Sequence, residues 1–319
     1  SLIGLGNACY SLGEYRRAIE FQQQSLEIKR AIGDRRGEAS SLIGLGNACY
    51  SLGEYRRAIE FLQQSLEIKR AIGDRRGEAN SLNNLGNAYD SLGEYQRAIE
   101  FQQQSLEIFR AIGDRGGEAT SLNNLGNAYY SLGEYQRAIE FQQQSLEIFR
   151  AIGDRGGEAT SLNNLGNAYY SLGEYQRAIE FQQQSLEIKR AIGDRRGEAN
   201  SLIGLGNAYD SLGEYQRAIE FHQQSLEIFR AIGDRRGEAN SLFNLGNSLA
   251  KLKRKSEANN AYLHARELYQ GMGLDADVED CNNAIQRLKR KSTFSPRFPQ
   301  SLWRWLNRLW RLLRARLRR

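Results

Sequence analysis

The chain has 319 residues, of which 44 are basic and 38 acidic, giving a net charge of +6. Residues 287–319 contain twelve basic residues and no acidic one, whereas residues 1–286 contain 32 basic and 38 acidic residues. Residues 1–286 are therefore acidic overall and give no reason to expect nucleic acid, whereas the basic C-terminal end predicts a partner of its own. The three cysteines are too few for a disulfide framework, which favours a reducing, cytoplasmic location.

The chain repeats with a period of 40 residues. The motif SLGEY begins at Ser11, Ser51, Ser91, Ser131, Ser171 and Ser211. The units 81–120 and 121–160 differ only at one position, where Asp90 stands in the first and Tyr130 in the second. A period of this length is typical of solenoids and related arrays, and it overrides the expectation of two ordinary domains.

Each unit predicts two helices. In the fourth unit, apolar residues recur at three- and four-residue steps over 122–132 and again over 135–152. Gly133 and Gly153 follow these stretches as stop signals, and Asp154 can cap the next helix. The second helix is apolar around much of its circumference, so it needs neighbours on more than one side. Stacked hairpins supply those neighbours.

The residues Leu125, Gly126, Tyr129, Tyr135 and Ala138 stand at a spacing that resembles the tetratricopeptide repeat. The resemblance covers about residues 1–273 in seven units, and the 40-residue unit looks most like Pins/LGN-type or cyanobacterial arrays. It implies an all-α, right-handed superhelical solenoid of about seven hairpins. It also implies binding of extended peptides of partner proteins in the concave groove. The C-terminal motifs with which Pins/LGN proteins bind G-protein α subunits are not found in the sequence.

The sequence departs from the family at one core position. Where the family places a large apolar residue, this chain has Gln22, Gln102, Gln142 and Gln182, with Leu62 and His222 as exceptions. We expect neighbours such as Phe141 to take over the packing, since the stack would otherwise be looser. After the seventh unit, 277–291 predicts a polar capping helix, which terminal repeats need. The solenoid with its cap is therefore expected over 1–291.

The first helix of each unit is expected to line the groove. Its inward stripe follows from helical spacing and, in one hairpin, runs through Gly156, Thr160, Asn163, Asn167 and Tyr170. One asparagine of the stripe recurs in every unit, at Asn7, Asn47, Asn87, Asn127, Asn167, Asn207 and Asn247. An asparagine amide both donates and accepts, so this ladder can hold a peptide main chain. The alternative is that each asparagine only bonds within its own hairpin.

Two further sets of residues complete the predicted peptide-binding site. Tyr50, Tyr130 and Tyr170 offer apolar surfaces with a polar tip, and Arg76, Arg196 and Arg236 at one edge favour acidic ligand groups. Together they predict a long, partly acidic peptide as the ligand. The stripe differs between units, with Arg76 where the next unit has Gly116, while Leu-Gly-Asn recurs in all seven. Such variation favours a recognition surface, and drift of a solvated face is the alternative interpretation.

The C-terminal end predicts a linker over 292–300 and a basic amphipathic helix over 301–319. The apolar half of that helix carries three tryptophans and the other half carries most of the arginines. The residues expected to contact a membrane or a partner are Trp303, Trp305, Trp310, Arg304, Arg308 and Arg311. An anionic membrane surface, a protein groove, RNA and an extension without function all remain alternatives, and the helix is too short and too charged to span a bilayer.

Nothing in the sequence indicates an enzyme. Only two histidines occur, they lie in different units, and no metal-ligand spacing is found, so we expect no cofactor and no metal. The predicted function is a non-enzymatic protein-interaction scaffold. The alternatives are a peripheral membrane adaptor held by the C-terminal helix, and a regulatory module of a larger signalling protein. Ser1 falls inside a repeat, which predicts further sequence on its N-terminal side.

Overall fold

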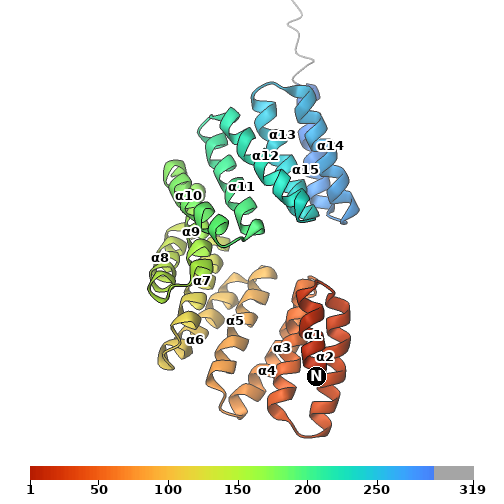
Figure 1. Cartoon of the computed structure of the whole chain (residues 1–319), viewed down its shortest axis with the longest axis vertical. Helices are drawn as coiled ribbons and strands as arrows, with labels where there is room; N and C mark the ends of the chain where they lie inside the picture. The colour runs from red at the N-terminus through yellow and green to blue at the C-terminus, as the bar shows by residue number, and fades with distance from the viewer. Residues whose placement is uncertain (291–319) are drawn as a thin grey trace, which may run out of the picture. The chain divides into compact units, whose positions relative to one another are not determined.

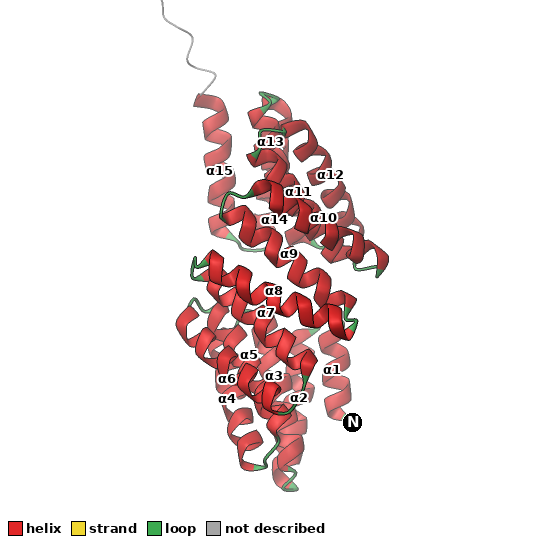
Figure 2. Ribbon diagram, turned by 90° about the vertical axis from the view of Figure 1, so that its left-hand side faces the viewer, coloured by secondary structure: helices red, strands yellow, loops and turns green. Residues whose placement is uncertain are grey.

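The computed structural model describes residues 1–290, and these residues form fifteen α-helices and no strand (Figures 1 and 2). The chain divides into two compact units, Ser1–Gly233 and Asp234–Arg319. The helices of the first unit are α1 (Leu2–Ser11), α2 (Tyr15–Ala31), α3 (Arg35–Ser51), α4 (Tyr55–Ala71), α5 (Arg75–Ser91), α6 (Tyr95–Ala111), α7 (Arg115–Ser131), α8 (Tyr135–Ile152), α9 (Arg155–Ser171), α10 (Tyr175–Ala191), α11 (Arg195–Ser211) and α12 (Tyr215–Ala231). Those of the second are α13 (Arg235–Lys251), α14 (Lys255–Gly271) and α15 (Asp275–Arg290).

Short turns with their own start and stop signals separate the helices. From α3 to α13, each odd-numbered helix begins after an aspartate that accepts a hydrogen bond from the amide of the glycine three residues later, as Asp114 does from Gly117 at 3.0 Å. This is the N-cap that the sequence predicted at Asp154, and it satisfies one of the free amides of the first turn. After each odd-numbered helix from α1 to α11 the chain turns through a glycine with positive φ, such as Gly93 at 83°, whereas Lys253 takes this place after α13.

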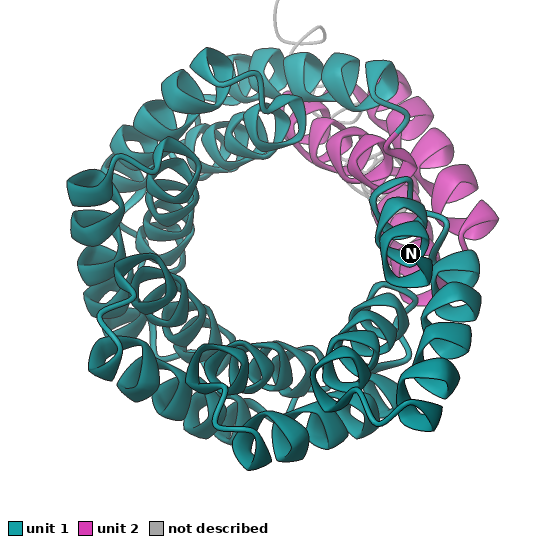
Figure 3. Ribbon diagram, turned by 60° about the horizontal axis from the view of Figure 1, so that its bottom comes forward, with its two compact units in different colours: residues 1–233 teal, residues 234–319 magenta. Residues whose placement is uncertain are grey.

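The first unit has two layers of helices. Figure 3 shows an inner layer and an outer layer around a hollow. The odd-numbered helices form the inner layer, because each of them also contacts the next odd-numbered helix, whereas successive even-numbered helices barely approach one another. The exposed sides of the odd helices therefore form an inner face, as the repeat pattern predicted.

Small and aliphatic side chains fill the space between the layers. Leu82, Leu85, Ala88 and Ala98 are completely buried in one hairpin, and their equivalents are buried in its neighbours. Cys9 and Cys49, which stand where other hairpins have tyrosine, are also buried. Each hairpin thus buries its faces against the next one, and the all-α solenoid fold is confirmed.

The glutamine at the unusual core position stays in the core. Gln142 is only 1 % exposed, and a methyl group on Gly126 would come within 2.5 Å of its Nε2. Phe141 packs against the core beside it, as expected: it is half-buried and stacks on Tyr129 with ring centroids 5.2 Å apart. The glutamine nevertheless stays buried, because its amide finds hydrogen-bond partners inside the hairpin.

The second unit contains one complete hairpin and the helix that follows it. Tyr262 of α14 occupies the glutamine position and is buried. The capping helix expected over 277–291 is α15, which packs on α14 and buries Cys281 and Ile285. The linker predicted over 292–300 and the amphipathic helix predicted over 301–319, with its tryptophans and arginines, lie outside the described residues. No helix within residues 1–290 is long and apolar enough to cross a membrane.

Candidate functional site

The asparagine ladder lies on the odd-numbered helices, and each asparagine from α3 to α13 is half-buried. In four hairpins the buried glutamine donates from Nε2 to the asparagine Oδ1: Gln22 to Asn7, Gln102 to Asn87, Gln142 to Asn127 and Gln182 to Asn167, at 2.9–3.0 Å. In the second unit, the Tyr262 hydroxyl donates to Asn247 Oδ1 at 2.9 Å. Bonding inside the hairpin, the alternative considered from the sequence, is therefore present for these five asparagines.

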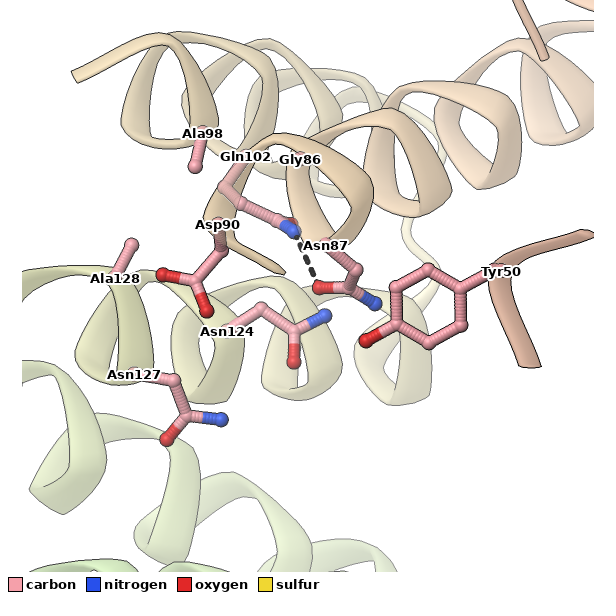
Figure 4. A pocket seen from close by; sticks show the side chains of 9 residues that line it. All are labelled: Tyr50, Gly86, Asn87, Asp90, Ala98, Gln102, Asn124, Asn127 and Ala128. Atoms are coloured by element: carbon pink, nitrogen blue, oxygen red, sulfur yellow. Dashed lines mark hydrogen bonds between the residues drawn. The ribbon is translucent and has the colours of Figure 1, made fainter. Parts of the chain in front are cut away.

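These bonds fix which end of each asparagine amide remains available. The oxygen is engaged by the core glutamine, while among the described residues no acceptor binds Nδ2 of Asn87, Asn127 or Asn167. In Figure 4, Nδ2 of Asn87 lies on the side nearer Tyr50. The ladder accordingly presents hydrogen-bond donors, and the acceptor that the sequence analysis also assigned to it is already used.

The remaining members of the ladder differ because the core residue opposite them differs. Leu62 cannot donate, and Asn47 Oδ1 accepts from Asn84 Nδ2 of the next hairpin at 3.2 Å. Asn207 lies in the hairpin of His222, and Asn247 belongs to the second unit. The ladder is thus uniform only over the hairpins that carry glutamine.

An asparagine that the sequence analysis did not single out links successive hairpins, by donating to the stripe position of Asn163 in the hairpin before it. Asn124 Nδ2 donates to Asn83 Oδ1 at 2.8 Å, and Asn164 Nδ2 donates to Asn123 Oδ1 at 3.1 Å and to Asn127 Oδ1 at 3.0 Å. The signal that could have revealed it is the exchange of asparagine for glycine at Gly44 and Gly204, the equivalent positions. A polar network therefore extends along the inner face of the first unit.

The predicted tyrosines lie at the C-terminal ends of α3, α7 and α9. The rings of Tyr50 and Tyr130 are 37 % and 38 % exposed, and each is tilted against the tyrosine five residues later, with ring centroids 5.4–5.5 Å apart. The Tyr50 hydroxyl lies 2.9 Å from the Ser91 hydroxyl and that of Tyr130 3.0 Å from Ser171, in hydrogen bonds to the next hairpin. Each ring is thus fixed between two hairpins and remains partly exposed.

The predicted arginines are exposed side chains of α5, α11 and α13. Arg76 is highly exposed, and its Nε lies 2.8 Å from Asp114 Oδ2, so an ion pair already matches its charge. Arg196 is exposed on α11, and Arg236 is exposed in the second unit. Within residues 1–290, no group of His, Cys, Asp and Glu side chains is arranged to hold a metal ion.

The repeat motif places the chain among known proteins. The family model for the tetratricopeptide repeat matches residues 1–71, 67–111, 77–151, 117–191, 157–231 and 197–271. The chain belongs to the tetratricopeptide repeat family. No curated protein sequence is significantly similar to this tetratricopeptide repeat chain.

Several solved structures share the fold of this tetratricopeptide repeat array. The apo form of RapI is 18 % identical with a TM-score of 0.69, over 85 % of this chain and 97 % of that one. BtubC from P. vanneervenii is 23 % identical with a TM-score of 0.60, over 69 % of this chain and 92 % of that one. A Rap protein complexed with competence and sporulation factor is 15 % identical with a TM-score of 0.61, over 88 % of this chain and 85 % of that one. At these identities the likeness concerns the fold alone.

Proposed function

We propose that the chain is a non-enzymatic scaffold that holds an extended peptide of a partner protein along the inner face of its first unit. The observation that carries this proposal is the uniform orientation of three asparagine amides. Because Gln102, Gln142 and Gln182 hold the oxygens, the Nδ2 groups of Asn87, Asn127 and Asn167 are free to donate. Donors repeated along a face are suited to the carbonyl groups of an extended main chain.

Two kinds of side chain add to the main-chain contacts. The exposed parts of the Tyr50 and Tyr130 rings provide apolar area with little loss of side-chain entropy. Arg76 and Arg196 are exposed side chains of the first unit and support the predicted preference for acidic groups, although Asp114 competes with a ligand for Arg76. A scaffold role agrees with the Rap protein of similar fold that was crystallised with competence and sporulation factor.

The proposal is tested with peptides selected from a random display library on the full chain. The variant that changes Asn87, Asn127 and Asn167 together to alanine is expected to bind them at least tenfold more weakly, because three donors are lost. The matched control changes Gln103, Gln143 and Gln183, exposed amides on the even-numbered helices, to alanine and should leave the affinity unchanged. Circular dichroism verifies folding, and equal affinity of a folded asparagine variant and the control would contradict the proposal.

A single substitution tests the orientation itself. Asn127→Asp keeps an oxygen for Gln142 and Asn164 to bond but removes the donor. We expect this variant to keep its fold and to lose affinity for the selected peptides. If Asn127→Asp binds as well as the unchanged chain, the main-chain contact is not made through Nδ2.

A second candidate function rests on the sequence of residues 301–319 alone. Its leucines and tryptophans fall on one half of a helical projection and its arginines on the other, which favours an anionic membrane surface. Flotation with vesicles containing an anionic lipid tests it. The full chain should float, whereas a variant with Trp303, Trp305 and Trp310 changed to alanine should remain in the soluble fraction.

A further inference from the structure

The inner face of the first unit contains a polar cavity of about 210 Å³ between α3, α5, α6 and α7. Its walls are formed mainly by Tyr50, Asn87, Asp90, Gln102, Asn124 and Asn127 (Figure 4). A volume of this size accommodates several water molecules, or the end of a long side chain. The cavity is therefore large enough for part of a bound peptide.

Two acceptor atoms in the cavity wall have no donor among the described residues. They are Oδ1 of Asp90 and Oε1 of Gln102, and both atoms are buried. Buried acceptors without a partner are unfavourable, so a ligand that donates hydrogen bonds gains more here than at a satisfied surface. The same oxygen of Gln142 is also unpaired, so the carboxylate distinguishes this cavity from its neighbours.

The Asp90 carboxylate is poorly compensated. Burial raises its pKa, and only the hydrogen bond with Ser131 opposes this shift. No basic side chain of the described residues contributes to stabilising the ionised form. A cation placed in the cavity would supply that stabilisation.

The neighbouring hairpin provides a natural comparison. Residues 81–120 and 121–160 are identical except that Tyr130 replaces Asp90. The equivalent cavity, with Tyr130, Gln142, Asn164 and Asn167 in its wall, has only about 40 Å³. The aspartate gives the first cavity its negative charge, and Tyr50 of the preceding hairpin lines the first cavity while no residue of the preceding hairpin lines the second.

Tyr50 closes the opposite side of the cavity. Its ring is 37 % exposed, and its hydroxyl is fixed by the bond with Ser91. An aromatic ring across a small cavity from a carboxylate favours an ammonium or guanidinium group between them, because both attract a cation. Amide oxygens in the wall add acceptors for the N–H groups of such a cation.

We propose that the cavity at Asp90 binds the basic end of a lysine or arginine side chain. As part of peptide recognition it rests on the proposed function, because the peptide main chain brings the side chain to the cavity. The chemistry of the cavity itself does not depend on that function, since a small cation can enter it alone. Recognition of the peptide thus includes one basic residue, in addition to any acidic groups near the arginines.

The probe for the cavity is N-acetyl-arginine methylamide, with the neutral citrulline derivative as its control. Both are titrated against the full chain by ligand-observed NMR at low ionic strength, where charge attraction is least screened. The arginine derivative should bind at least tenfold more tightly than the citrulline derivative. Equal binding of the two, or no detectable binding of the arginine derivative, overturns the proposal.

Three substitutions locate the binding. Asp90→Asn keeps the shape and removes the charge, and Asp90→Tyr fills the cavity with the residue that the next hairpin carries. Each substitution should lower the affinity for the arginine derivative at least tenfold. Tyr130→Asp should give the equivalent cavity a carboxylate, so that the probe also binds there, more weakly because Asp90 stands at the place of Tyr50. Retained affinity in both folded Asp90 variants overturns the proposal.

The same variants separate this proposal from the proposed function. One outcome is that the Asp90 variants lose affinity for the probe while the triple asparagine variant keeps its affinity for the selected peptides. That result supports the cation site and contradicts the peptide-scaffold proposal. If the peptides need the ladder while Asp90→Asn changes neither probe nor peptide binding, only the cavity proposal fails.

Discussion

A buried glutamine in four hairpins connects the core of the solenoid to its inner face. Gln142 bonds through Nε2 to the Asn123 carbonyl and to Asn127, but its own oxygen has no donor among the described residues. A buried, half-satisfied amide is a poor choice for stability alone. Its effect on the inner face is to hold Asn127 in one orientation.

Replacing this glutamine by leucine should raise the stability of the chain and lower its affinity for peptides. In the variant Gln142→Leu, which copies the natural Leu62, we expect the free energy of unfolding to rise by about 1 kcal/mol because an unpaired buried acceptor is removed. Affinity for peptides selected on the unchanged chain should fall, since Asn127 is no longer held. Urea denaturation and a binding titration measure the two effects. The reverse change, Leu62→Gln, serves as control and should lower stability; a drop in stability of Gln142→Leu would contradict the account.

His222 replaces the glutamine in one hairpin and should make stability depend on pH. Burial lowers its pKa to about 4, and the nearby Asp210 opposes this shift. The unfolded chain has a histidine pKa near 6.5, so between these values it binds more protons than the folded chain. This contribution to stability is therefore complete above about pH 6.5 and is lost as the pH falls toward 4.

The matched variant for this prediction is His222→Gln, which uses the residue of the other hairpins. Lowering the pH from 7 to 4 should destabilise the unchanged chain more than the variant, by roughly 3 kcal/mol at most. Chemical denaturation at several pH values measures the difference. Identical pH profiles of the two proteins would show that His222 is not the group responsible.

At the scale of the helix, the aspartate caps are the features most open to measurement. Asp154 and Asp114 cap α9 and α7 in the same way, but only Asp114 also pairs with an arginine of the preceding hairpin, Arg76. Asp154→Ala should cost about 1 kcal/mol of stability through loss of the cap. Asp114→Ala should cost up to about 0.5 kcal/mol more, because it also removes the ion pair with Arg76. The difference is small because exposed ion pairs contribute little to stability. Equal stability of both variants and the parent in urea would contradict the capping role.

The helices could be predicted from the sequence because each one carries its own signals. The apolar stretch over 135–152 became α8 (Tyr135–Ile152), and the glycine and aspartate after it became the turn and the cap. The hydrogen bonds of the inner face could not be predicted in this way. Gln142 and Asn127 are 15 residues apart, and Asn124 and Asn83 are 41 apart, so their contact depends on how the helices are placed. The cavity at Asp90 depends on residues from three successive hairpins for the same reason.

At the scale of the whole solenoid, each hairpin of the first unit contacts only its neighbours. Deleting residues 121–160 joins two interfaces that are nearly identical to those already present. We expect the shortened chain to fold, with a helix signal and a denaturant m-value reduced in proportion to the residues removed. Circular dichroism during urea unfolding measures both quantities. Loss of cooperative unfolding in the deletion variant would mean that contacts beyond nearest neighbours are needed.

The near-identity of residues 81–120 and 121–160 has a consequence for any ligand held by repeated contacts. A peptide bound only through its main chain could shift by one hairpin and meet the same atoms again. Two equivalent placements would favour binding by about 0.4 kcal/mol through their statistical weight, but the peptide would then have no unique position. Asp90 is the single side chain that makes these two hairpins different, and so it can determine which of the two alignments a bound peptide adopts.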